Sequence, residues 1–143
     1  MEIKRSYRRR GAPDFQVALY LSNANSIRKY TKPEYHPEQE IVLVEEGMVV
    51  MQLDGDTKTF HKGDIYAIPA NAVHCYRVCS DDGVTLSLVF DVSAITMQPD
   101  HYFQNNFTKP LEEGRLQLPA QRLECAGSDD AAAGLPLPST PYA

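Results

Sequence analysis

The sequence predicts an all-β domain built as a sandwich or barrel. Short apolar runs recur up to residue 91 with Gly, Pro, Asn and Asp between them, a spacing typical of antiparallel β folds. The run at 84–90 alternates, with its apolar residues on one face and Thr85 and Ser87 on the other. No long helical period precedes residue 92.

The expected strands are apolar or β-branched segments bounded by turn residues. They cover residues 15–21, 27–30, 40–46, 48–53, 57–60, 65–69, 74–78 and 84–91. Gly47 separates two of these runs. Asp54-Gly55 is typical of a type I′ hairpin turn, which needs positive φ, so 57–60 is expected to return along 48–53. The segment 48–53 is apolar on both faces, so we expect another subunit or the C-terminal part of the chain to cover its outer side.

The chain changes character after the last expected strand. Residues 93–107 are expected to form a short helix or irregular turns around Phe103 and Phe107, and 108–119 to return over the barrel. From Ala126 the composition is typical of a linker or tail. The expected organisation is a basic N-terminal arm at 1–14, a folded domain at 15–124 and a tail at 125–143.

Composition limits the classes of function. The chain has 143 residues, 43% of them hydrophobic, with no apolar run of ~20 residues and no signal-peptide pattern. We therefore expect a single cytoplasmic domain with no membrane partner. The formal net charge is −5, although five of the fourteen Lys and Arg residues lie in the first ten positions. The acidic remainder argues against direct binding of nucleic acid by this chain. Cys75, Cys79 and Cys125 have no CxxC spacing and are expected to be plain thiols.

The stretch of His and Glu residues before the longest apolar run supplies the first candidate site residues. Alternate residues of an extended chain point the same way, so a barrel interior that takes Val42 and Val44 also takes His36 and Glu40. Glu34 has the same parity. A carboxylate inside a barrel must be paired, protonated or hydrated, because an isolated buried charge is costly.

A second histidine, His74, opens the expected strand at 74–78, and Tyr76 shares its face. Two histidines and one carboxylate are ligand types for Zn, Fe, Ni or Mn. Three interpretations stay open for His36, Glu40 and His74: a pocket lining that binds a small effector, a transition-metal site, or an internally hydrogen-bonded cluster without a ligand. Tyr76 could stack on a planar ligand or pack as an ordinary tyrosine.

Two spacings resemble the motifs of the cupin superfamily. Glu34-x-His36-x3-Glu40-x6-Gly47 is similar to the first cupin motif, and Gly63-x5-Pro69-x-Asn71-x2-His74 to the second. The resemblance implies a double-stranded β-helix, or jelly-roll barrel, over about residues 15–91, followed by a short helical or irregular C-terminal segment. Glu34 replaces the first histidine of the family's metal motif. Asn71 replaces a glycine, a mild change because asparagine tolerates positive φ.

A narrower resemblance joins the barrel to the segment after it. Residues 40–78, together with Phe103, Phe107 and the Pro-Leu-Glu-Glu-Gly stretch at 110–114, are similar to the N-terminal sensor half of AraC-family transcription regulators. This resemblance implies a homodimer that binds a small-molecule effector, a sugar or another polar metabolite. DNA would be bound only by helix-turn-helix units that do not occur in this sequence. In some members the N-terminal arm folds over the effector, whereas composition alone favours a frayed arm here.

The resemblances imply two functions. In the first, His36, Glu40, His74, Tyr76 and Glu34 line an effector pocket, no cofactor is favoured and the protein is not an enzyme. In the alternative, His36, Glu40 and His74 hold a divalent transition metal, with Glu34 as a further candidate ligand, in a metal-dependent cupin enzyme such as an isomerase or dioxygenase. A third interpretation is a stand-alone binding module without catalysis.

Overall fold

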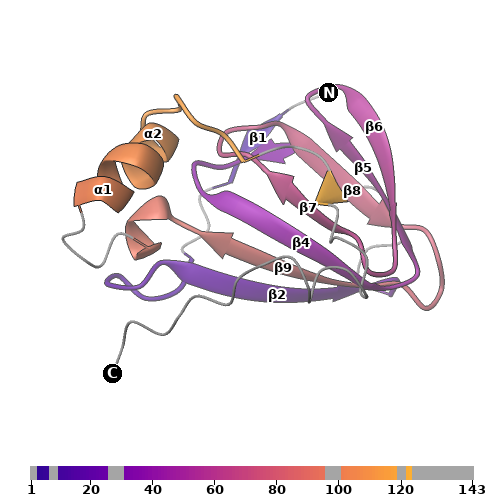
Figure 1. Ribbon diagram of the computed structural model, residues 1–143. Helices are drawn as coiled ribbons and strands as arrows, with labels where there is room; N and C mark the ends of the chain where they lie inside the picture. Colours follow the sequence, from indigo (N-terminus) through magenta and orange to yellow (C-terminus); the bar gives the residue numbers. More distant parts are fainter. Residues whose placement is uncertain (1–2, 7–9, 26–30, 96–100, 119–121, 124–143) are drawn as a thin grey trace, which may run out of the picture.

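The computed structural model describes residues 3–6, 10–25, 31–95, 101–118 and 122–123, which form two facing five-stranded sheets (Figure 1). One sheet has the order β1 (Lys4–Arg5), β3 (Glu34–Tyr35), β8 (His74–Val78), β5 (Met48–Leu53), β6 (Asp56–His61). The other has the order β10 (Arg122–Leu123), β7 (Ile65–Ile68), β4 (Gln39–Glu46), β9 (Val84–Phe90), β2 (Val17–Asn23). Neighbouring strands are antiparallel except β1 and β3, which are parallel. The predicted all-β jelly-roll barrel is confirmed.

The strands from β4 to β9 agree closely with the predicted segments. Strand β2, the one expected at 15–21, begins later than predicted, at Val17, because Phe15 closes a tight turn with Ala12. The N–H of each of these two residues donates to the carbonyl of the other, at 3.0 and 3.1 Å. The strand expected at 27–30 lies outside the described residues.

Three turns depend on residues that accept a positive φ. Asp54 and Gly55, with φ of 47° and 92°, form the predicted turn between β5 and β6. Asn71, in the second cupin-like motif, has a φ of 64°, as its replacement of a glycine suggested. Gly47, with a φ of 73°, lies where the chain leaves β4 in one sheet and enters β5 in the other.

The interior of the barrel is apolar at one end and polar at the other. Val42 and Val44 of β4 are fully buried and belong to a core with Met51 and Tyr66. Glu40 lies on the same face of β4, and it is buried as well. The prediction that Glu40, Val42 and Val44 share the interior face of β4 is therefore confirmed. The apolar core ends along this strand, between Val42 and Glu40.

Strand β9 presents its polar face to the interior. Thr85 and Ser87 are almost fully buried, together with Val89. Leu88, on the opposite face, is exposed and pairs in register with exposed Leu19 of β2. The alternation predicted the two faces correctly, but the hydrophobic face points outward.

The described part of the N-terminal arm is packed against the barrel. Strand β1 lies parallel to β3, and the Ser6 N–H donates to the Tyr35 carbonyl at 2.9 Å. Ser6 and Arg10 are buried. The frayed arm that composition favours is wrong for these residues, because their partners come from distant parts of the chain.

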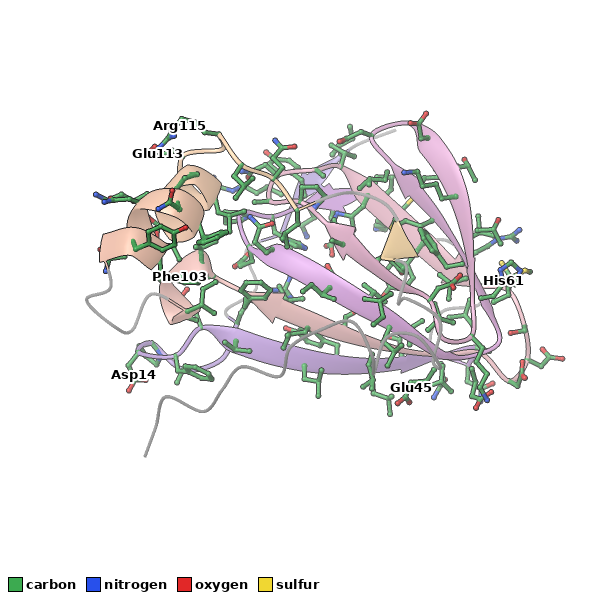
Figure 2. The ribbon with its side chains drawn as sticks, in the orientation of Figure 1. Asp14, Glu45, His61, Phe103, Glu113 and Arg115 are labelled. Atoms are coloured by element: carbon green, nitrogen blue, oxygen red, sulfur yellow. The ribbon has the colours of Figure 1, made fainter. Side chains whose placement is uncertain are left out.

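A helical segment follows the barrel, as predicted around Phe103 and Phe107. After the 3-10 turn η1 (Val92–Ile95), it consists of α1 (His101–Phe103), the π-type turn η2 (Gln104–Thr108) and α2 (Lys109–Glu112). Figure 1 shows α1 and α2 at one end of the barrel, and Figure 2 shows Phe103 on this segment. Thr108 and Pro110 are buried there. Among the described helices none has the length and apolar content that crossing a membrane would need.

Candidate functional site

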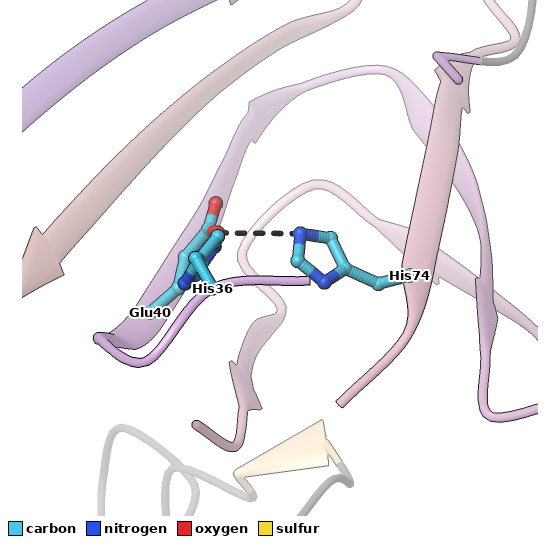
Figure 3. A group of neighbouring side chains, drawn as sticks. All are labelled: His36, Glu40 and His74. Atoms are coloured by element: carbon cyan, nitrogen blue, oxygen red, sulfur yellow. Dashed lines mark hydrogen bonds and ion pairs between the residues drawn. The ribbon is translucent and has the colours of Figure 1, made fainter. Parts of the chain in front are cut away.

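Three of the predicted residues meet at the polar end of the barrel (Figure 3). His36 lies just before β4, Glu40 lies near the start of β4, and His74 opens β8 in the facing sheet. All three are buried, with His36 only 1% exposed. The Nε2 atoms of His36 and His74 lie 3.2 and 3.7 Å from the same atom, Glu40 Oε2. The two imidazole rings pack edge to face, 5.0 Å between centroids.

Backbone carbonyls fix which nitrogen of each ring carries the proton. His36 Nδ1 lies 3.1 Å from the Glu38 carbonyl oxygen, and His74 Nδ1 lies 3.0 Å from the Ala72 carbonyl oxygen. A carbonyl only accepts, so each Nδ1–H donates, and each Nε2 of a neutral ring presents a lone pair to Glu40. Three electron-rich atoms therefore converge, and the cluster needs a cation between them: a proton or a metal ion.

In the metal-free protein the pKa shifts of both residues favour a proton shared within the His36–Glu40 pair. Burial alone would lower the pKa of His36, but the hydrogen bond and the charge of Glu40 raise that pKa above its ordinary value of 6.5. Burial alone would raise the pKa of Glu40, but the hydrogen bond from His36 and the charges of His74 and His36 lower it below 4.5. Both directions describe an imidazolium paired with a carboxylate.

The same three residues also fit a divalent transition metal. One ligand atom from each lies within 4.8 Å of the others. Ligands bound to one ion at about 2.0–2.2 Å have donor atoms roughly 3 Å apart, close to the 3.2 and 3.7 Å observed here. The hydrogen bonds at Nδ1 are those that orient metal-binding histidines. Glu34 is not part of this group of three.

The cluster forms part of the wall of a cavity of about 660 Å³. Of the five residues predicted to line a pocket, Glu34, Glu40, His74 and Tyr76 belong to the wall, whereas His36 is not among the lining residues. The remaining lining residues come from the N-terminal arm, β2, β9 and the segment before β3: Lys4, Ser6, Arg10, Tyr20, Ser22, Thr31, Lys32, Ser87 and Val89. Tyr76 is half-buried, and burial raises the pKa of its hydroxyl.

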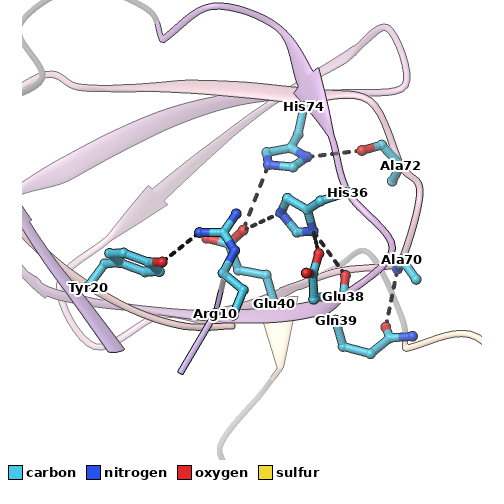
Figure 4. A network of polar contacts seen from close by, with 9 residues as sticks. All are labelled: Arg10, Tyr20, His36, Glu38, Gln39, Glu40, Ala70, Ala72 and His74. Atoms are coloured by element: carbon cyan, nitrogen blue, oxygen red, sulfur yellow. Dashed lines mark hydrogen bonds and ion pairs between the residues drawn. The ribbon is translucent and has the colours of Figure 1, made fainter. Parts of the chain in front are cut away.

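Arg10 is the most unusual member of this wall because the residue is only 5% exposed. Its Nη1 donates to the Tyr20 hydroxyl at 2.8 Å, and its Cζ lies 5.2 Å from the centre of the Tyr20 ring (Figure 4). Gly11, with a φ of 65°, begins the next turn of the chain. A Cβ at Gly11 would lie 2.7 Å from the Val17 backbone nitrogen, so only glycine allows this path of the chain.

Sequence reasoning missed several lining residues. Ser87 had a usable signal, because the polar face of an alternating strand faces inward when a barrel holds a polar cavity. The position of Lys32 at the cavity follows from a long-range contact of its neighbour: the Thr31 N–H donates to the Tyr76 carbonyl at 3.0 Å. Arg10 had no local signal, since four of the first ten residues are arginines and nothing distinguishes the one that is buried.

The predicted thiols behave as ordinary cysteines where the structure describes them. Cys75 is buried and Cys79 half-buried, and both are free. Burial raises the pKa of the Cys75 thiol, which disfavours the reactive thiolate. Cys125 lies outside the described residues.

Comparison with known proteins agrees with this architecture. A family model described as "Cupin domain" matches residues 28–92, which include both motifs and the three clustered residues. The barrel has the cupin fold. No curated protein matches the sequence.

Solved structures resemble the cupin barrel at low identity. KdgF from Halomonas sp. is 19% identical, with 55% of this chain and 70% of that chain covered and a TM-score of 0.46. A cupin 2 conserved barrel domain protein from Salinispora arenicola is 19% identical, with 58% and 68% covered and a TM-score of 0.46. The DMSP lyase DddQ from Ruegeria pomeroyi is 20% identical, with 52% and 38% covered and a TM-score of 0.43. Resemblance at this level transfers no reaction, metal or substrate to this chain.

Proposed function

We propose that this cupin domain senses a small polar molecule, as the N-terminal half of an AraC-type transcription regulator does. The supporting observation is that one cavity is lined by both the arm and the barrel. Lys4, Ser6 and Arg10 belong to the arm, whereas Glu40 and His74 belong to the barrel. A ligand in this cavity would touch both parts, so its binding free energy would depend on where the arm lies.

The proposed mechanism is a shift between two arrangements of the arm. The ligand favours the packed arrangement by the difference between its affinities for the two arrangements, and by no more than that. The hydroxyl groups of Ser22, Thr31, Tyr76 and Ser87 suit a sugar or another hydroxylated metabolite. The DNA-binding units of such a regulator would lie outside these 143 residues.

We also propose that two copies pair through the outer face of the second sheet. Leu19 and Leu21 of β2 are 65% and 66% exposed. They lie in register with Leu88 and Leu86 of β9, which places four leucines side by side on the outer surface. A contiguous apolar surface of this kind is typical of an interface between protein molecules.

Hydrogen–deuterium exchange tests the sensing proposal. A thermal-shift screen of monosaccharides and small organic acids would first identify a ligand. We expect that ligand to slow exchange both in the arm at 4–6 and in β8. Removing residues 1–10 should weaken its binding, whereas removing 126–143 should not. Protection confined to the barrel, or equal effects of the two truncations, would contradict the proposal.

The alternative function is a metal-dependent enzyme, and the convergence of His36 and His74 on Glu40 favours it. These three residues would hold the ion, which when bound would supply a Lewis acid. Arg10 would orient a substrate in the same cavity, and the Tyr76 hydroxyl would donate or accept a hydrogen bond. Metal analysis of untagged protein beside His36→Ala tests this alternative. Stoichiometric metal that is lost in the variant supports it, and its absence from both proteins leaves the sensing proposal in place.

A further inference from the structure

We propose that the cavity binds a small organic carboxylate, and that Arg10 holds the carboxylate group. The inference rests on the proposed function in using the same cavity. It specifies the ligand's charge, which that proposal leaves open.

The first argument is the incomplete pairing of a buried cation. Arginine is almost never buried without partners, because removing its charge from water is costly. Among the residues that the structure describes, Arg10 has one hydrogen-bond partner, the neutral Tyr20 hydroxyl, and its Nε has no acceptor. Within the described residues it makes no ion pair. An anion in the cavity would supply what this guanidinium lacks, since its planar donors match a carboxylate.

The nearby carboxylate, Glu40, does not fill that role. Its Oε2 is shared by the Nε2 atoms of His36 and His74. No ion pair joins Arg10 to Glu40, although the structure describes both residues. The site therefore contains a carboxylate that already has partners and a cation that does not.

The charge of the cavity points the same way. The wall contains Lys4, Arg10 and Lys32 against two carboxylates, Glu34 and Glu40, although the whole chain has a net charge of −5. A cavity with a cationic excess inside an acidic protein selects anions over neutral molecules of the same shape. A volume of about 660 Å³ suits a small metabolite.

Ser87 places a second buried polar group on the same wall. Ser87 is 2% exposed, and its Oγ makes no hydrogen bond of good geometry, although it lies beside both the Glu40 carboxylate and the Tyr76 hydroxyl. Ser87 belongs to β9 and Arg10 to the arm. A ligand with a carboxylate at Arg10 and a hydroxyl group at Ser87 would contact the arm and the barrel at once.

Calorimetry with a matched pair of probes tests the proposal. Glucuronate and glucose differ by a carboxylate in place of a hydroxymethyl group, and malonate is a smaller acid. We expect at least one of the two acids to bind more tightly than glucose. Arg10→Gln should weaken that binding by about 10- to 100-fold, the range for losing a charged hydrogen bond. Arg115→Gln, which removes an exposed arginine paired with Glu113 (Figure 2), should leave it unchanged.

A ligand-free measurement keeps the test independent of the probes. If Arg10 is held for a ligand, Arg10→Met should unfold in urea at the same or a higher concentration than the wild type, because it removes a poorly paired buried charge. A clearly lower midpoint would make Arg10 structural and overturn the proposal. Failure of both acids to bind more tightly than glucose would also overturn it, as would unchanged binding by Arg10→Gln. Glucose that bound and protected the arm would still support the sensing proposal.

Discussion

At the scale of single residues, the site is defined by the hydrogen bonds that the Nδ1–H groups of His36 and His74 donate. Both Nδ1 atoms donate to backbone carbonyls, so both Nε2 atoms are left to Glu40. The main chain around His36 and His74 orients both rings. The cluster is therefore ready to accept either a proton or a metal.

The metal-free protein should show a pH-dependent contribution from this pair. The raised pKa of His36 means that its contribution is fully present below pH 6.5 and is lost as the pH rises through the folded-state pKa. The lowered pKa of Glu40 means that its contribution is present above pH 4.5 and is lost as the pH falls through the folded-state pKa. The stability difference between wild type and His36→Asn should therefore be largest between these two values.

Urea unfolding in the presence of a chelator, from about pH 3 to pH 9, measures this difference. The chelator removes any metal that would replace the proton. A difference between the two proteins that stayed constant over the whole range would show that His36 and Glu40 do not titrate as a pair.

At the scale of elements, Gly47 determines how one strand passes into the next sheet. A Cβ there would overlap Ser80 Oγ and lie 2.8 Å from the Gly83 Cα. Ser80 cannot move away freely, because its hydroxyl accepts a hydrogen bond from the Met48 N–H at 2.9 Å. The glycine that ends the first cupin-like motif thus has a steric reason in this chain.

We expect Gly47→Ala to lower the free energy of unfolding by about 3 kcal/mol or more, from backbone strain plus overlap. Gly63→Ala is the matched control. Gly63 also has a positive φ, 86°, but a Cβ there meets nothing within 4 Å. Its cost should be the conformational one alone, about 1–2 kcal/mol. Equal losses in chemical denaturation would show that the space around Gly47 is not restrictive.

The strands could be predicted from the sequence because their signals are local. Apolar runs and the Asp54-Gly55 turn lie within a few residues of one another, and the parity of His36 and Glu40 with Val42 followed from strand geometry. The packing of the arm and the burial of Arg10 depend on residues distant in the chain. The direction of the β9 faces was also undetermined, because it depends on whether the interior at that end is apolar or polar.

At the scale of the whole molecule, the usual arrangement of an apolar interior and a polar surface is partly reversed. One end of the interior holds charges and hydroxyl groups, whereas the outer face of β2 and β9 exposes leucines. Both departures occur in the same sheet, since β9 contributes Ser87 to the cavity and Leu88 to the surface. One strand thus separates the proposed ligand site from the proposed interface between copies.

We expect the wild-type protein to be a dimer and the Leu19→Lys, Leu21→Lys double variant to be a monomer, because two charges would have to be buried in the interface. Sedimentation velocity measures the change. Ile95→Lys is the control, since Ile95 is 46% exposed but belongs to η1, outside this sheet face. A monomeric wild type, or dissociation by the control, would place any contact between copies elsewhere.

The short pairing of β1 with β3 has a consequence for the timing of binding. The paired strands are two residues long, whereas β4, β5 and β9 are longer and each lies between two partner strands. Segments of low local stability open without global unfolding, so the arm can detach while the barrel stays intact. The residence time of a molecule in the cavity would then be set by the opening rate of Lys4–Arg5, and substitutions in β1 would change how long a signal lasts more than how stable the protein is.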